Sequence, residues 1–253
     1  MLVFSLWVGI GASLGLWRLA RSAQRQPAEW VNAGLFVLIF SLAGARLSFV
    51  LHNLAYFTTH LIEIPRMGLG GLTWPGAVLG ALLALAVLVV RYRSPRTGRL
   101  SPGWLCDQLY PLLPTVAIGA WLGSWQAGSG YGALAPSGVW WAIPAAAEDG
   151  LLLLRWPVQP LAALSLLGFF ALLELWVEPM RPAGRISCLA LTGLLLHLLI
   201  FTGLVGDPSP YWNGLRLDTW MALVMLIAFV TSLFAYRLLA RGKKRTWRRY
   251  SRG

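Results

Sequence analysis

The side chains that could bind an anion or move a proton are few, and most of them stand in apolar surroundings. Arg46 lies near the end of a long hydrophobic stretch, where a cation either contacts a lipid headgroup or forms a structural pair. His197 lies in the middle of another stretch, where a neutral imidazole either acts as a base or hydrogen-bonds a neighbouring helix. Gln126 and Gln159 carry amides that can donate to a phosphate oxygen. These residue types favour phosphate binding with one candidate base.

The other acids and imidazoles have structural roles open to them. Asp107 and Asp218 begin apolar stretches, and for Asp218 the capping of a helix competes with catalysis. His52 and His60 fall in or near a loop, where either an exposed position without function or the role of a base is open. Glu174 lies near the end of a stretch, where we expect a solvated or paired carboxylate.

Composition defines the surroundings of these groups. The 253 residues are 57% hydrophobic and only 12% charged, with a net charge of +12. Soluble chains carry about 25% charged residues, and a soluble nucleic-acid binder needs a water-exposed basic face that this apolar chain does not offer. The two cysteines, Cys106 and Cys188, form no metal-ligand spacing and no disulfide framework. We therefore expect a membrane protein with no metal, no cofactor and no nucleic-acid partner.

Seven apolar stretches approach the length of about 20 residues that crosses a bilayer. They are Leu2–Leu19, Val31–Leu51, Pro75–Val90, Trp104–Leu122, Pro160–Val177, Ile186–Val205 and Thr219–Leu239. The fold class predicted is an all-α integral membrane protein of about seven transmembrane helices. One membrane domain over residues 1–240 precedes a basic tail at 241–253, which we interpret as a cytoplasmic anchor beside anionic lipid, with an RNA-binding arm as the alternative.

The distribution of positive charge predicts the orientation. With the N-terminus outside, seventeen of the 21 Lys and Arg residues fall in cytoplasmic segments, and the four exceptions are Arg46, Arg66, Arg155 and Arg216. A cleaved signal peptide needs positive charge before its apolar run, whereas here the charge follows it. We therefore predict an outside N-terminus and a cytoplasmic C-terminus.

Glycine-rich segments lie on the predicted outer side. Met67–Pro75 and Gly119–Gly132 are unusually rich in glycine, and Ser137–Pro157 mixes tryptophan with proline, as is typical of a segment at headgroup level. Irregular backbone at membrane depth is tolerated when protein or a wet cavity surrounds it. We predict that these segments line an outward, lipid-accessible cavity, while two plain surface loops remain the alternative. Without an internal repeat, a transporter with two inverted halves is disfavoured.

Five blocks in this order resemble the prolipoprotein diacylglyceryl transferase family. Gly44–Leu47 is similar to its G-x-R-[LI], Gly70–Gly76 to G-G-[ML]-[SA]-F-H-G, and Asp107–Gly132 to D-x-x-x-P followed by G-x-G-R-x-G-N-F-x-N-G-E-x-x-G. Ser137–Pro144 is similar to W-G-x-x-F-P, and Arg155–Gln159 to R-H-P-S-Q. Their order and spacing make the resemblance specific.

The resemblance implies a seven-span enzyme of the bacterial inner membrane that uses no cofactor. Members of the family move a diacylglyceryl group from phosphatidylglycerol to the thiol of a lipobox cysteine and release glycerol phosphate. Such a reaction needs a thiolate, a basic residue near the departing phosphate and a cavity open to lipid. The implied partners are phosphatidylglycerol or another anionic phospholipid and the lipobox segment of a prolipoprotein.

Several reactive positions of the family carry other residues in this chain. The family histidine corresponds to Pro75, its arginines to Trp121 and Leu196, its asparagine to Ser124, its glutamate to Ser129 and its tyrosine to Val8. An indole replaces neither the charge nor the donor fork of an arginine. The catalytic residues are therefore open, with His197 as the candidate base. The predicted lipid-binding residues are Arg46, Trp121, Ser124, Gln126, Gly132 and Gln159.

Three hypotheses follow from this sequence. The first is diacylglyceryl transfer to a protein thiol by a modified mechanism, and the second is a catalytically impaired relative that binds phospholipid or lipoprotein without turnover. The third is another transfer reaction on the same scaffold. Whether the chain is an enzyme is open at this point.

Overall fold

Six helices are long and apolar enough to cross a membrane. The computed structural model describes residues 2–23, 26–67, 70–92, 101–146, 151–176 and 182–250, with 237–250 as backbone. Within these residues, the six helices are α1 (Leu2–Ser22), α2 (Pro27–His52), α4 (Trp74–Arg91), α7 (Val158–Trp176), α8 (Arg185–Leu204) and α9 (Leu217–Tyr250). Helices satisfy their own backbone groups in lipid, where water is absent. The predicted all-α integral membrane fold is confirmed.

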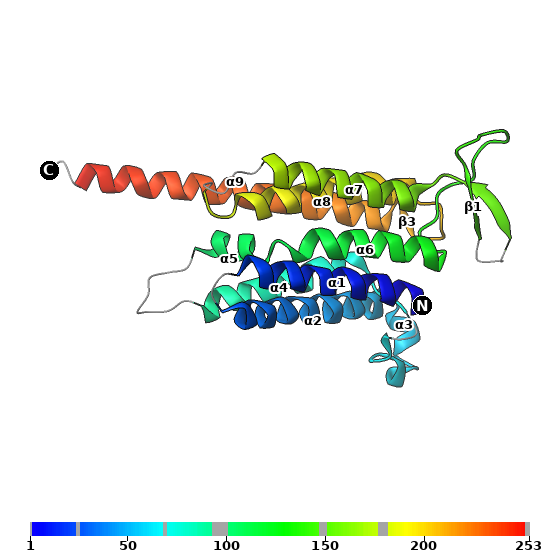
Figure 1. The fold of residues 1–253 in the computed structure, drawn as a ribbon, viewed down its shortest axis with the longest axis horizontal. Helices are drawn as coiled ribbons and strands as arrows, with labels where there is room; N and C mark the ends of the chain where they lie inside the picture. Colours follow the sequence, from blue (N-terminus) through cyan, green and yellow to red (C-terminus); the bar gives the residue numbers. More distant parts are fainter. Residues whose placement is uncertain are drawn as a thin grey trace.

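The fourth predicted span, Trp104–Leu122, is wrong as a single helix. It is divided into α5 (Pro102–Leu109) and α6 (Leu112–Ala127), and Pro111 stands at the break because a proline has no N–H to continue the helical ladder. The 16 residues of α6 rise only about 24 Å, less than the roughly 30 Å of a bilayer core. α6 packs between α1 and α7, and the two chain termini lie at opposite ends of the bundle (Figure 1).

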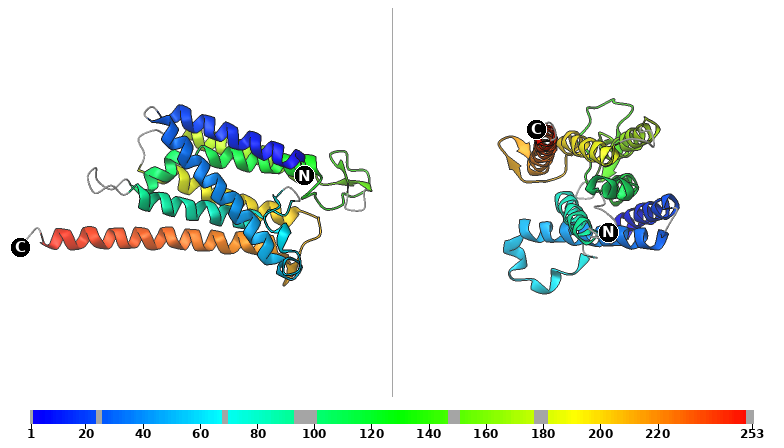
Figure 2. Two further views of the ribbon diagram at one scale, coloured as in Figure 1. Left: turned by 90° about the horizontal axis from the view of Figure 1, so that it is seen from below. Right: turned by 90° about the vertical axis from the view of Figure 1, so that its left-hand side faces the viewer.

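The helices form two groups with α6 between them. Seen end-on, α1, α2 and α4 lie on one side of α6, and α7, α8 and α9 lie on the other (Figure 2). Each group has its own apolar cluster. One holds Leu19, Ala33, Val37, Ala84, Leu88, Leu105, Leu109 and Leu112. The other holds Tyr110, Leu166, Phe170, Ala190, Leu194, Leu198 and Ala222. Burial of these side chains stabilises each group separately.

Glycine permits the close crossing of α2 and α4. A Cβ on Gly44 would lie 3.0 Å from the Cα of Gly80, and a Cβ on Gly80 would lie 2.8 Å from the carbonyl carbon of Phe40. Side chains at these positions would hold the backbones apart, as in other helix pairs packed through small residues in membranes. The close crossing therefore sets the positions of the ends of α2 and α4 relative to each other.

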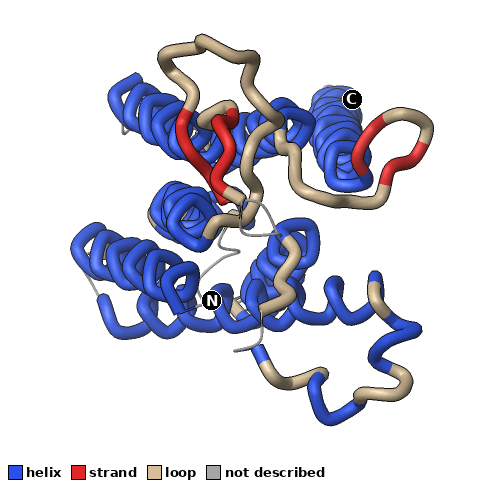
Figure 3. Tube along the Cα trace, turned by 90° about the vertical axis from the view of Figure 1, so that its right-hand side faces the viewer, coloured by secondary structure: helices blue, strands red, loops and turns tan. Residues whose placement is uncertain are grey.

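Most of the irregular structure lies at the bundle end that holds the N-terminus, called here the hairpin end (Figures 1 and 3). It carries α3 (Leu54–Phe57), the 3₁₀ turn η1 (Leu61–Glu63), and two antiparallel hairpins, β1 (Ile143–Ala146) with β2 (Leu152–Arg155) and β3 (Tyr211–Trp212) with β4 (Leu215–Arg216). In the first hairpin Ile143 pairs with Arg155, and in the second Tyr211 pairs with Arg216. Both hairpins therefore end on an arginine.

Four of the predicted segments reach beyond the described residues. Positions 68–69 and 147–150 of the predicted outer segments, 177 of the fifth predicted span, and 251–253 of the predicted tail lie outside them. The backbone of 241–250 continues α9 as a helix. The division into a membrane domain and a basic tail stays a prediction.

Candidate functional site

Residues of the predicted site meet where α6 ends and α7 begins, at the hairpin end. Gln159, in the first turn of α7, is only 2% exposed, and its Nε2 donates to the carbonyl oxygen of Ser129 at 3.1 Å. The N–H of Ser129 in turn donates to the carbonyl of Ser124 at 3.0 Å, which closes the end of α6. Gln159 therefore positions the glycine-rich segment that follows α6.

His197 lies beside Trp121 in an aromatic group. Its ring stacks on Phe201 with centroids 4.3 Å apart, and Trp121 meets it edge-on at 6.0 Å. Nε2 of His197 lies 3.1 Å from the carbonyl oxygen of Ala162 and 2.9 Å from Oγ of Ser165. Because a carbonyl oxygen only accepts, the contact with Ala162 assigns the ring proton to Nε2 and leaves Nδ1 as a proton acceptor. Nδ1 is buried and has no partner among the described residues.

Arg46 does not join this group. Its guanidinium lies between the rings of Phe49 and Phe57, at 5.6 and 5.4 Å from their centroids. Four hydrogen bonds occupy four of its five N–H groups, all to backbone carbonyls, namely those of Glu63, Ile64, Gly70 and Gly71. Arg46 is 5% exposed and holds residues 63–64 and 70–71 against α2. The contacts favour the structural role that the sequence left open over the predicted lipid contact.

Two other predicted lipid-binding residues also make structural contacts. The side-chain oxygen of Gln126 accepts a hydrogen bond from Nε1 of Trp7 at 2.8 Å, so Gln126 faces α1. Gly132 is buried and pairs as an isolated β-bridge with Val205, and a Cβ there would lie 2.8 Å from Cγ2 of Val158. Gly132 therefore permits close backbone packing.

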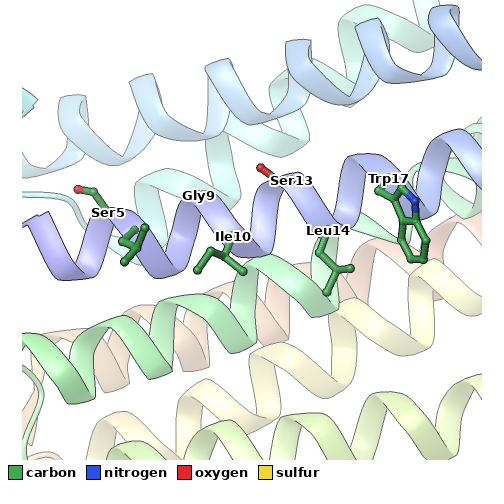
Figure 4. A pocket seen from close by; sticks show the side chains of 7 residues that line it. Ser5, Gly9, Ile10, Ser13, Leu14 and Trp17 are labelled. Carbon is green, nitrogen blue, oxygen red and sulfur yellow. The ribbon is translucent and has the colours of Figure 1, made fainter.

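Two grooves are present on the sides of the bundle. One of about 320 Å³ lies between α1, α6 and α7 and extends from Trp7 to Arg18 and Glu174. The other, of about 750 Å³, is a shallow groove along α1 over Gly9 and Ser13 (Figure 4). None of the six predicted lipid-binding residues lines either groove. The predicted outward cavity stays a prediction.

Most of the remaining candidates have structural partners. Asp107 accepts hydrogen bonds from the N–H groups of Gly184 and Ser187, at 2.5 and 3.0 Å, and so caps α8. Glu174 pairs with Arg18 at 2.5 Å, as expected of a paired carboxylate.

His52, the last residue of α2, and His60, in the loop after it, both have partners nearby. Nδ1 of His52 lies 2.7 Å from the carbonyl oxygen of Ser48. The ring of His60 stacks on Tyr56 at 4.2 Å.

Asp218 stands in the first turn of α9, and Pro75 is fully buried near the start of α4. None of these residues adjoins His197 in the structure described.

Two buried arginines were missed as site residues. Arg155, at the end of β2, is 7% exposed and lies over the ring of Tyr131 at 4.2 Å. Arg216, at the end of β4, is 5% exposed and forms an ion pair with Asp207 at 2.6 Å. Both are among the four arginines that depart from the positive-inside rule, and three of these four are buried. That departure was a usable signal, since a buried cation away from the cytoplasmic side needs a specific reason.

Four buried polar atoms lack a partner among the described residues. They are Nε1 of Trp74, Nε of Arg155, Nδ1 of His197 and Nε of Arg216. Trp74 begins α4 and packs against the same apolar cluster as Trp121. Native proteins leave few buried polar groups unsatisfied, so each of these four atoms calls for an explanation. Three of them are donors, and Nδ1 of His197 is an acceptor.

These features define a multi-pass helical membrane protein with buried polar groups at one end. A model of the family "Prolipoprotein diacylglyceryl transferase" matches residues 1–235. The chain belongs to the prolipoprotein diacylglyceryl transferase family, as its sequence blocks predicted.

Relatives named phosphatidylglycerol–prolipoprotein diacylglyceryl transferase match along most of the chain. That of Thermosynechococcus vestitus is 28% identical over 93% of this chain and 84% of its own. That of Methylibium petroleiphilum is 25% identical over 88% of this chain and 89% of its own. A third, from Geobacillus kaustophilus, is 32% identical over 48% of this chain and 43% of its own.

Proposed function

We propose that this protein transfers a diacylglyceryl group from phosphatidylglycerol to the thiol of a lipobox cysteine. The observation that carries the proposal is the family match over residues 1–235, which includes His197 and Gln159. The unpartnered buried donors at the hairpin end support it, because a phosphate ester offers the acceptors that they lack.

The reaction has to make one bond and break one. The thiol sulfur attacks the glycerol carbon that carries the phosphate, a C–S bond forms, and the C–O bond to the phosphate breaks. Glycerol phosphate departs with the electron pair of that bond. Because the thiolate is the nucleophile, the thiol proton must go to a base and from there to the departing phosphate.

His197 is the base that we infer. Its Nδ1 is buried without a partner, while the contact of Nε2 with Ala162 holds the ring in place. The neighbouring indole of Trp121 has no acceptor nitrogen and does not compete for the proton. A thiol that reaches Nδ1 would find a proton acceptor already oriented, which is the geometric requirement of general-base catalysis.

We place the hairpin end outside the cytoplasm of a bacterial cell, in the inner membrane. Seventeen of the 21 Lys and Arg residues then face the cytoplasm. In this orientation the lipobox segment of an exported prolipoprotein approaches from the hairpin end, and phospholipid enters from the outer leaflet. We assign the acyl chains to the largely apolar groove between α1, α6 and α7.

The test is a transfer assay with the purified protein. Phosphatidylglycerol vesicles and a lipobox peptide are incubated with it, and the peptide is read by mass spectrometry beside a typical family member. We expect a diacylglyceryl mass increment that disappears when the peptide cysteine is changed to serine. His197→Gln should lower the rate by about 100-fold or more, whereas His60→Gln, in the exposed loop, should leave it unchanged.

The absence of an increment while the family member turns over would overturn the proposed transfer. In that case a phospholipid-binding relative without turnover and a transfer to another acceptor would be the remaining hypotheses. Equal rates for His197→Gln and the unaltered protein would remove His197 as the base but leave the transfer proposal intact.

A further inference from the structure

The two grooves on the sides of the bundle share one ridge of α1. Ile10 and Leu14 line both of them. In Figure 4 these two side chains project from α1 on the side away from Ser5 and Ser13. Because they are four residues apart, they follow one another on the same face of the helix. A molecule that straddles this ridge has room for one apolar chain in each groove.

Both grooves lead to an arginine near the C-terminal end of α1. Arg18 lines the groove between α1, α6 and α7. Arg21 lies over the ring of Trp17, which lines the shallow groove, with its guanidinium carbon 4.8 Å from the ring centroid. Arg18 and Arg21 are three residues apart and are therefore neighbours on the helix surface. Two apolar grooves thus lead away from one pair of cations.

Positive charge exceeds negative charge at this pair of arginines. Nη2 of Arg18 donates to Oε1 of Glu174 at 2.5 Å, and among the described residues this is its only hydrogen bond. Arg21 is exposed and forms no ion pair with any carboxylate that the structure describes. A guanidinium has five N–H groups, whose fork geometry suits phosphate oxygens. An additional anion can therefore bind both arginines while Arg18 keeps its contact with Glu174.

The groove between α1, α6 and α7 lies mainly in the half of the bundle opposite the hairpin end. From α7 it is lined by residues from the midpoint of that helix onward, namely Leu167, Phe170, Ala171 and Glu174. Between Trp7 and Arg18, α1 rises about 16 Å, close to the roughly 15 Å that one leaflet contributes to the hydrocarbon core. Substrate chains from the outer leaflet reach only about ten residues into α1. The part of the groove beside Leu14 and Arg18 is therefore open to another lipid.

We propose that Arg18, Arg21 and the two grooves bind a two-chain anionic phospholipid of the leaflet opposite the hairpin end, and we call them the α1 lipid site. The phosphate contacts both guanidinium groups, and the acyl chains lie on either side of the ridge of Ile10 and Leu14. In the orientation proposed above this leaflet is the cytoplasmic one, where basic pockets between helices attract anionic lipid. His197 lines neither groove, so the site is separate from the transfer reaction.

The test is native mass spectrometry of the full chain released from neutral detergent. Dioleoyl-phosphatidic acid is added in increasing amounts, and the fraction of protein that carries lipid gives the dissociation constant. We expect Arg21→Gln to weaken binding about 5-fold, the effect of removing one cation beside an anionic lipid. Arg21 has no ion pair to lose among the described residues, so this change spares the fold. Arg91→Gln changes an exposed arginine of the last turn of α4 that lines neither groove, and it should stay within about 2-fold.

A second pair of variants tests the acyl chains. Gly9 lines the shallow groove, and a Cβ placed there meets nothing within 4 Å. Gly9→Leu should fill the groove and weaken the binding of dioleoyl-phosphatidic acid and dioleoyl-phosphatidylcholine alike, by about 4-fold or more, the loss expected when one methylene group is no longer buried. Gly168→Leu, at an equally open position of α7 that lines neither groove, should change neither affinity. Arg21→Gln should affect phosphatidic acid alone, because phosphatidylcholine has no net charge.

Three results would overturn the α1 lipid site. The first is equal affinity of Arg21→Gln and the unaltered protein for phosphatidic acid. The second is an equal loss with Arg91→Gln, which would indicate general attraction between lipid and the basic end of the bundle. The third is a loss with Arg21→Gln while Gly9→Leu changes neither lipid, since the phosphate would then bind without the grooves. None of these measurements needs an acceptor peptide, so the site and the proposed transfer can fail independently.

Discussion

Replacement of Gly80 by alanine should separate α2 from α4 and destabilise the bundle. The added Cβ would lie 2.8 Å from the carbonyl carbon of Phe40, and closer to its oxygen. Carbon–carbon contacts are ordinarily about 3.5 Å or longer, so relief of the contact with the carbon alone needs a shift of roughly 0.7 Å, and the closer oxygen needs a larger one. The obstacle is backbone, which no rotamer change can relieve. Overpacking of this kind costs about 1–3 kcal/mol.

Gly168→Ala provides the matched control. Gly168 lies in α7, and nothing stands within 4 Å of a Cβ placed there. Alanine is favoured over glycine in a helix interior by about 0.5–1 kcal/mol, so this change should stabilise the protein slightly. Gly80→Ala gains the same helix propensity, but the clash with the backbone of Phe40 outweighs this gain. The two substitutions should therefore shift stability in opposite directions.

The assay is unfolding of the full chain in neutral detergent, followed by circular dichroism as the temperature rises. We expect a lower midpoint for Gly80→Ala than for the unaltered protein and an equal or higher one for Gly168→Ala. Phosphatidylglycerol transfer should fall with Gly80→Ala, because α2 and α4 carry Arg46 and Trp74 at the hairpin end. An increase in the midpoint with both variants would refute the close crossing of α2 and α4.

Three other outcomes follow from contacts outside the helix crossing. Asp107→Ala removes the acceptor for the N–H of Ser187 and should lower the free energy of unfolding by about 1–3 kcal/mol, and an unchanged thermal midpoint would contradict the cap. Arg46→Lys should accelerate hydrogen–deuterium exchange in residues 63–64 and 70–71 more than in α9, because a lysine cannot reach four carbonyls at once. Equal acceleration in both segments would show that Arg46 does not hold this loop specifically. The pKa of Tyr56 is raised above 10.0, mainly because its hydroxyl donates a hydrogen bond to the carboxylate of Glu63. This bond therefore adds to the stability of the folded protein below pH 10, and that contribution is lost as the pH rises through the pKa of the folded state. Glu63→Gln should return the pKa toward 10.0 in an NMR titration of ¹³C-labelled tyrosine, and an unaltered pKa would exclude the bond.

The helical membrane fold could be predicted because length and apolarity are local properties. Six of the seven predicted stretches are single helices, since a run such as that of α2 admits few other structures in lipid. The remaining stretch, the fourth predicted span, was wrong because its apolar run from Trp104 to Leu122 continues across Tyr110 and Pro111, where the helix breaks. Membrane helices tolerate proline, so its presence did not mark the break.

The site was less predictable because contacts across the chain decide its roles. The sequence shows that Arg46 is a cation near the end of a helix, but its acceptors lie 17 to 25 residues away along the chain. Arg155 and Arg216 had a usable signal in the charge rule, yet only the structure shows that both side chains are buried. His197 was identified correctly as a candidate, whereas its free Nδ1 became visible only with the contact to Ala162.

The blocks that carry the family resemblance are largely the residues that pack the backbone. Gly44 permits the crossing of α2 and α4, Gly132 permits close packing against Trp156 and Val158, and Gln159 holds the glycine-rich segment. Backbone packing of this kind tolerates few substitutions, because even one methyl group has no place to go. A phosphate contact is less restricted, since any arginine that reaches the same space can supply the fork of donors. The fold of a diacylglyceryl transferase can therefore persist while its reactive groups come from other positions, which is the arrangement that the buried acceptor nitrogen of His197 would represent.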